Sequence, residues 1–67
     1  MFALSVNGET RTFSKAPSLA ELLAQLALTG KRVAVERNGE IVPRSRFAEQ
    51  ILEHGDQLEI VVAVGGG

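Results

Sequence analysis

The sequence predicts an α+β domain in which a mixed sheet of four or five strands packs against one main helix. Three observations indicate this fold class. Two Asn-Gly dipeptides, at positions 7–8 and 38–39, lie between short segments that suit β-strands. A helix start signal and an apolar stripe with helical spacing occupy residues 18–26. The last apolar segment, residues 57–64, alternates like a half-buried strand.

The first hairpin is predicted at the N-terminus. Apolar and small side chains alternate along residues 2–6, which is the period of a strand with one buried face. Asn7-Gly8 tolerates the positive φ angles of a two-residue hairpin turn. Residues 10–13 should therefore return as the antiparallel partner, with Phe13 opposite Phe2.

The main helix is predicted to begin after Ser18. Ser18 and Glu21 have the S-x-x-E spacing of a capping box. Four leucines at i, i+3, i+4 and i+7 form one apolar stripe that would cover the sheet: Leu19, Leu22, Leu23 and Leu26. Thr29-Gly30 predicts the helix end, because glycine readily takes the left-handed conformation found there.

A second hairpin is predicted around Asn38-Gly39. Its strands would be residues 33–37 and 40–42. Pro43 should end the second strand, because proline has no N–H to donate to a sheet.

A short helical turn is predicted before the last strand. Ser45 is the candidate N-cap of a turn over residues 46–52, in which Phe47 and Ile51 would share a face. Residues 53–56 then read as a turn that leads into the final strand.

The final strand turns apolar on both faces toward its end. Val61 and Ala63 fall where polar residues would continue the alternation of residues 57–64. If the first and last strands lie side by side in the middle of the sheet, with the helix across one face, the fold is the β-grasp of ubiquitin-like proteins. This reading gives a domain over residues 1–64 and a flexible tail over residues 65–67.

Composition restricts the classes of function. A chain of 67 residues can bury one small core and leaves little room for an internal active site. A net charge of −1 with 4% aromatic residues argues against a nucleic-acid surface. The lack of cysteine excludes disulfides, thiol catalysis and zinc-thiolate sites. Neither a membrane span nor a signal-peptide pattern is present, so a cytoplasmic protein is expected.

The segment with the most chemical content is Val64-Gly65-Gly66-Gly67. Glycines have no Cβ and can enter a slot that is too narrow for other residues. We therefore expect the Gly67 carboxylate to be the working group and the rest of the chain to be its handle.

No other group of residues forms a recognisable reactive motif. His54 is interpreted as a turn residue, because no nucleophile or second ligand lies near it in the sequence. The acidic residues do not match a metal or acid–base pattern; they include Glu36, Glu40, Asp56 and Glu59. The glycine run precedes no helix, so it is not a phosphate-binding loop, and ATP should bind a partner.

Three segments carry a resemblance to a known family. They are the run Val33-Ala34-Val35-Glu36-Arg37-Asn38-Gly39-Glu40-Ile41-Val42-Pro43-Arg44, the turn Gly55-Asp56, and the ending Ala63-Val64-Gly65-Gly66-Gly67. Together they resemble the ThiS family of sulfur carrier proteins of thiamine biosynthesis. The family's minimal ending is two glycines, which Gly66 and Gly67 match, and Gly65 adds reach.

The resemblance implies a carrier and not an enzyme. An E1-like adenylating enzyme would use ATP and Mg²⁺ to convert the Gly67 carboxylate into an acyl adenylate. Sulfur from a persulfide, such as that of a cysteine desulfurase, would displace AMP and leave a thiocarboxylate. Thiazole synthase would take up that sulfur. The chain itself is expected to bind no cofactor, with Gly65 and Gly66 threading into the partner active sites.

Partner docking is predicted on the apolar end of the last strand, at Val61, Ala63 and Val64. Arg37, Arg44 and Arg46 are candidates for pairing with acidic partner surfaces. The alternative for the apolar residues is coverage by the chain's own loops or by the short helical segment, and for the arginines it is solvated surface charge. Two other functions stay open, a related carrier for molybdopterin or tRNA thiolation and a β-grasp interaction module without a reactive tail.

Overall fold

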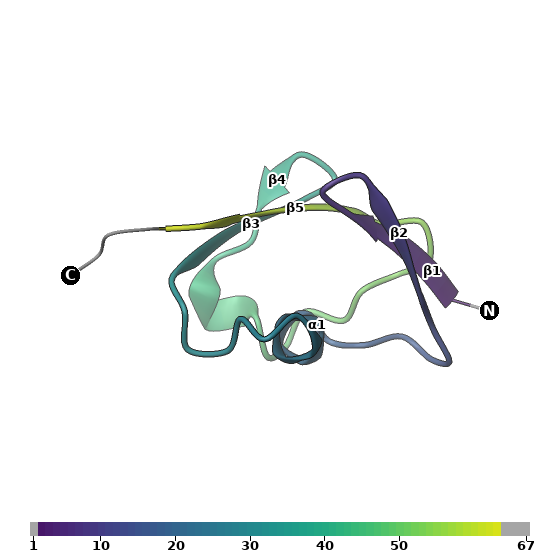
Figure 1. Cartoon of the computed structure of the whole chain (residues 1–67), viewed down its shortest axis with the longest axis horizontal. Helices are drawn as coiled ribbons and strands as arrows, with labels where there is room; N and C mark the ends of the chain where they lie inside the picture. Colours follow the sequence, from purple (N-terminus) through teal and green to yellow (C-terminus); the bar gives the residue numbers. More distant parts are fainter. Residues whose placement is uncertain (1, 64–67) are drawn as a thin grey trace.

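The computed structural model describes residues 2–63, so Val64 and the glycine tail lie outside the described residues. Five strands form one sheet in the order β2-β1-β5-β3-β4, and helix α1 (Leu19–Gln25) lies across one face (Figure 1). The strands are β1 (Phe2–Val6), β2 (Glu9–Phe13), β3 (Val33–Arg37), β4 (Glu40–Ile41) and β5 (Gln57–Val62). The parallel pairing of β1 with β5 in the middle of the sheet confirms the predicted arrangement.

Both predicted hairpins form around their Asn-Gly turns. Asn7 and Asn38 have φ angles of 51° and 52°, and the glycines after them have φ angles of 86° and 87°. Positive φ at both positions is the two-residue turn that matches the twist of antiparallel strands. Phe2 lies opposite Phe13, with the rings edge to face and their centroids 6.2 Å apart.

The same two asparagines fix β5 between its neighbours. The Asn7 side chain accepts from the N–H of Ile60 at 2.8 Å and donates to the Ile60 carbonyl at 3.1 Å. On the other side, Asn38 Oδ1 accepts from the N–H of Gln57 at 2.9 Å, and the Asn38 N–H donates to the Gln57 carbonyl at 2.8 Å. Each asparagine thus adds hydrogen bonds between its hairpin turn and β5.

Helix α1 begins as predicted. Ser18 Oγ accepts from the N–H of Glu21 at 3.1 Å, and the Glu21 carboxylate accepts from the N–H of Ser18 at 2.7 Å. This reciprocal pair confirms the capping box and satisfies two N–H groups that the helix itself cannot pair.

The predicted helix end at Thr29-Gly30 is wrong. The helix ends at Gln25, and Ala27 takes a φ of 60°. Leu28 N–H donates to the Leu23 carbonyl at 2.8 Å, and Ala27 N–H donates to the Ala24 carbonyl at 3.0 Å. These are the two bonds of a Schellman motif, which turns Leu28 back against the core. Burial of that leucine explains why an alanine accepts a conformation that favours glycine.

The predicted helical turn is shorter than expected and lacks its cap. A 3-10 helix, η1, spans Arg44–Arg46, and no side chain caps it, so the prediction for Ser45 is wrong. Further along, Leu52 N–H donates to the Pro17 carbonyl at 3.0 Å. The backbone there pairs with the loop before α1, which prevents a helix through residue 52.

The core lies between α1 and the inner face of the sheet. Its most buried side chains are Leu19, Leu22, Leu52, Leu58 and Val35. Phe47 packs against this core, but Ile51, predicted on the same face, is 55% exposed. No helix within residues 2–63 is long and apolar enough to cross a bilayer.

Candidate functional site

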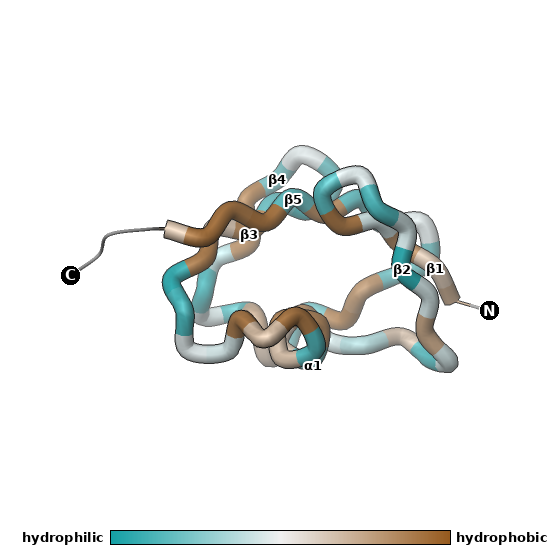
Figure 2. The backbone as a smooth tube through the Cα atoms, viewed as in Figure 1, coloured by the Kyte–Doolittle hydropathy of each residue, from teal (hydrophilic) through white to brown (hydrophobic). Residues whose placement is uncertain are grey.

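The outer face of the sheet carries an exposed apolar residue on a central strand. Val61 is 65% exposed, whereas Ile60, which belongs to the core, is 7% exposed. Ala34 of β3 lies directly opposite Val61 and is also exposed. Figure 2 shows hydrophobic colouring along the last part of β5. The alternative that the chain's own loops cover Val61 is therefore wrong for the described residues.

A shallow hollow adjoins Val61 at the end of β5. Its volume is about 310 Å³, and it is lined by Arg32, Val33, Ala34, Arg44, Val61 and Ala63. The N–H of Ala63 donates to the Arg32 carbonyl at 2.9 Å, so strand pairing continues past the end of β5. Among the predicted docking residues, the structure brings together Val61, Ala63 and Arg44, while Val64 lies outside the described residues.

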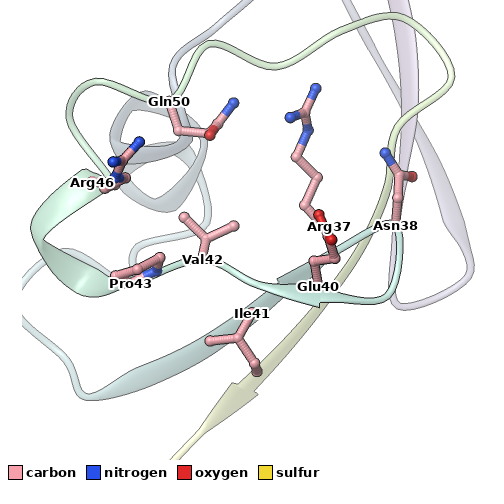
Figure 3. A pocket seen from close by; sticks show the side chains of 8 residues that line it. All are labelled: Arg37, Asn38, Glu40, Ile41, Val42, Pro43, Arg46 and Gln50. Carbon is pink, nitrogen blue, oxygen red and sulfur yellow. The ribbon is translucent and has the colours of Figure 1, made fainter.

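Arg46 lies in a different place. It lines a second hollow of about 400 Å³ beside β4, together with Arg37 and Gln50 (Figure 3). The path of the chain through η1 separates Arg46 from the hollow beside Val61. Sequence reasoning instead missed Arg32, which precedes β3 and lies beside Arg44 in that hollow.

A buried carboxylate fixes the start of β5. Asp56 is 5% exposed and accepts hydrogen bonds from Arg37 Nε at 2.8 Å and Asn38 Nδ2 at 3.1 Å. The N–H of Glu53 donates to it at 2.8 Å. This cluster ties the β3–β4 turn to the turn before β5. The sequence predicts Asp56 in a turn and places it in the family resemblance, but no structural role was assigned to its carboxylate.

The electrostatics of this cluster favour the ionised state. Burial alone would raise the pKa of Asp56, but the hydrogen bonds from Arg37, the Glu53 N–H and Asn38 outweigh burial, so the pKa lies below its ordinary value. The hydrogen bond to Asp56 raises the pKa of Arg37. The pair is therefore charged at neutral pH and acts as a structural clip.

His54 lies in the predicted turn, and its imidazole is engaged by the first strand. Its Nδ1 accepts from the N–H of Ala3 at 2.9 Å, and its ring meets that of Phe2 edge to face. Within residues 2–63, no group of three His, Asp or Glu side chains is placed to hold a metal ion. The predicted working residues Gly65, Gly66 and Gly67 lie outside the described residues.

Comparison with known proteins gives one consistent family. The family model described as the ThiS family matches residues 4–67. The sulfur carrier protein ThiS of Bacillus subtilis is 42% identical over 65 residues, which cover 96% of this chain and 98% of that protein. The crystal structure of ThiS from Geobacter metallireducens has a TM-score of 0.82 at 33% identity, covering 98% of this chain and 100% of that chain.

Some relatives are much longer. A thiazole synthase of Paramagnetospirillum magneticum is 48% identical over 64 residues, which cover 96% of this chain. The chain spans only 20% of that synthase's length.

Proposed function

The chain belongs to the ThiS family, and on this basis we propose that it is a sulfur carrier for the synthesis of the thiamine thiazole. The observation that carries the proposal is the exposed Val61 on a central strand, with two arginines beside it and a glycine run that begins four positions later in the sequence. This surface suits docking, and the glycines suit delivery of a terminal acyl group into another protein.

The proposed chemistry is acyl activation followed by sulfur transfer. A carboxylate is a poor acyl donor, because oxide is a poor leaving group. Attack of a Gly67 carboxylate oxygen on the α-phosphorus of ATP releases pyrophosphate and forms an acyl adenylate. A persulfide sulfur then attacks the acyl carbon and AMP leaves, after which a thiol cleaves the acyl disulfide to leave the thiocarboxylate.

The groups that catalyse these steps belong to the partners in this proposal. An E1-like adenylating enzyme supplies the nucleotide site with its Mg²⁺, and a desulfurase persulfide supplies the sulfur. The carrier contributes docking through Val61, Ala63 and Arg44 and reach through the glycines, which span on the order of 10 Å when extended.

Thiazole synthase is the proposed recipient of the sulfur. Two thiazole synthases, from P. magneticum and Magnetococcus marinus, contain a region similar to this chain within one longer polypeptide. A carrier-like region joined to the synthase supports their working together, since linkage raises the effective concentration of one for the other.

The test is the mass of the carrier after reaction. The chain is incubated with the adenylating enzyme, ATP, Mg²⁺, a sulfur donor and a thiol, and intact and peptide masses are measured. The expected result is exchange of one oxygen for one sulfur on the peptide that contains Gly67. A matched variant that lacks Gly66-Gly67 should keep its circular dichroism spectrum and gain no sulfur. No exchange with an enzyme shown to be active would contradict the proposal, and unfolding of the shortened variant would contradict the division into handle and tail.

Recipient choice is measured with the same thiocarboxylate form. Offered in parallel to thiazole synthase and to a molybdopterin synthase, it should deliver sulfur to the first. Delivery only to the second would identify it as a molybdopterin carrier.

A further inference from the structure

The outer face of β3 and β5 is divided into charged and apolar zones. At the end of β5, Arg32 and Arg44 flank the hollow beside Val61. One step back along the strands, Ala34 lies directly opposite Val61. A further step back, about 7 Å along a strand, Glu36 of β3 lies directly opposite Glu59 of β5.

The two glutamates form an unfavourable pair in the isolated domain. Like charges directly opposite each other on neighbouring strands are destabilising. Within residues 2–63, the ion pairs are those of Arg37 with Glu53 and with Asp56. Neither Glu36 nor Glu59 takes part in an ion pair there. Glu36 is half-buried and Glu59 is exposed. A cation from outside the domain would relieve this repulsion.

An exposed isoleucine extends the apolar zone beside the glutamates. Ile41 lies opposite Glu36 in the β3–β4 pairing and is 65% exposed. Ile41 also lines the hollow beside β4, and in Figure 3 its side chain points in the opposite direction to that of Val42. A salt bridge made to Glu36 would therefore form next to apolar surface, where a partner would exclude water and strengthen it.

We propose that this face binds thiazole synthase in one orientation, which is set by two opposite charge contacts on either side of an apolar centre. A lysine or arginine of the synthase lies between Glu36 and Glu59, and acidic residues of the synthase face Arg32 and Arg44. The apolar centre is Val61 with Ala34. Both charge contacts follow from complementarity to groups on this face that have no ion pair within residues 2–63. The inference rests on the proposed function, because it takes the synthase as the partner.

The opposite charges at the two ends of this surface favour one orientation of the partner, which apolar contact alone would not do. Rotating the synthase by half a turn would place its cation on Arg32 and its acids on Glu59, so the wrong orientation is repelled. The correct orientation keeps the end of β5 at the acidic side of the synthase's docking surface.

The test compares stability and affinity in one variant. In E36Q/E59Q the repulsion is removed with almost no change of shape, so the melting temperature should rise by about 2–4 °C. Affinity for thiazole synthase, measured by titration calorimetry at low and high salt, should nevertheless fall about tenfold at low salt. The matched control is E9Q/E49Q, which removes the same charge at exposed positions on β2 and after η1 and should change the affinity less than twofold.

A second variant tests the other side of the surface. R32Q/R44Q should weaken binding of the synthase by a similar factor and should reduce the salt dependence of the affinity. The expected pattern is thus two weakened variants and one unaffected control.

Unchanged or tighter binding by E36Q/E59Q would overturn the inference, and so would equal losses in E36Q/E59Q and its control. These results leave the proposed function intact if wild-type protein binds the synthase and accepts sulfur. Absence of wild-type binding, by contrast, contradicts the synthase as partner and with it both proposals.

Discussion

Replacing Asp56 with asparagine tests how the start of β5 is held. The carboxylate accepts three hydrogen bonds while only 5% exposed, and its geometry leaves asparagine no good orientation. If the new amide oxygen faces Arg37 and the Glu53 N–H, the new amide NH₂ faces the NH₂ of Asn38. Asn38 cannot turn its amide around without losing the bond that its Oδ1 accepts from Gln57.

The expected cost follows from these contacts. Loss of the charge of a buried, hydrogen-bonded partner costs about 1.5–3 kcal/mol, and the opposed NH₂ groups of the two asparagines leave a further donor unsatisfied. We expect D56N to lower the free energy of unfolding by about 3 kcal/mol, which is most of the stability that a core of this size supplies. The matched control is E53Q, because Glu53 is 78% exposed and lies 3.8 Å from Arg37; it should cost less than about 0.5 kcal/mol.

The pH dependence has a definite sign. The pKa of Asp56 is lower in the folded chain than in the unfolded chain, whose aspartates titrate near about 3.9. On acidification the unfolded chain therefore binds the proton first. The contribution of Asp56 is complete above the unfolded pKa and is lost as the pH falls through the folded pKa. The stability difference between wild type and D56N should consequently stay constant from pH 7 to about pH 5 and shrink as the pH falls below about 4.

Urea unfolding followed by far-UV circular dichroism provides the measurement, because the chain has no tryptophan or tyrosine for fluorescence. With a slope of about 1 kcal/mol per molar urea for a small domain, the midpoint of D56N should lie about 2–3 M below that of wild type at pH 7. A loss below about 1 kcal/mol, or a difference that does not change with pH, would refute the role given to this carboxylate.

Three further substitutions are expected to have distinct effects. A27G should stabilise the domain by about 1 kcal/mol, because a φ of 60° is sterically unfavourable for alanine and accessible to glycine. Destabilisation in urea unfolding would contradict the observed helix end. S18A should cost about 1 kcal/mol in the same assay, since it removes the hydroxyl of the capping box, and an unchanged midpoint would argue against that cap. V61D should change the stability by less than about 0.5 kcal/mol, as expected of an exposed site, while weakening binding of the adenylating enzyme and the synthase; a large loss of stability would show that Val61 belongs to the core.

Much of the fold was predictable because its signals are local. The Asn-Gly dipeptides define both hairpins, and the spacing of Ser18 and Glu21 defines the helix start. The helix end was not predictable in this way, because Ala27 takes a left-handed conformation only to bury Leu28. The predicted helical turn through residue 52 also failed because of a distant contact. The backbone of residues 50–52 pairs with a segment more than thirty positions earlier in the chain.

The candidate site was predictable only in part. The broken alternation at Val61 indicated an apolar outer face, and its exposure is confirmed, while its docking role stays a prediction. The path of the chain after β4 decides which arginines lie near Val61. Arg32 and Arg44 line the hollow beside Val61, whereas Arg46, a candidate from the sequence analysis, lines the hollow beside β4. The Asp56 cluster joins residues that are 18 and 19 positions apart, which no local pattern reveals.

In the proposed function, sulfur carried on Gly67 reaches the thiazole product. The direct measurement is a single turnover in which the carrier is loaded with isotopically labelled sulfur and mixed with thiazole synthase and its small-molecule substrates. We predict that the label appears in the thiazole in proportion to the loaded carrier and that the Gly67 peptide returns to its carboxylate mass. Unlabelled thiazole formed while the carrier keeps its label would contradict the proposed function.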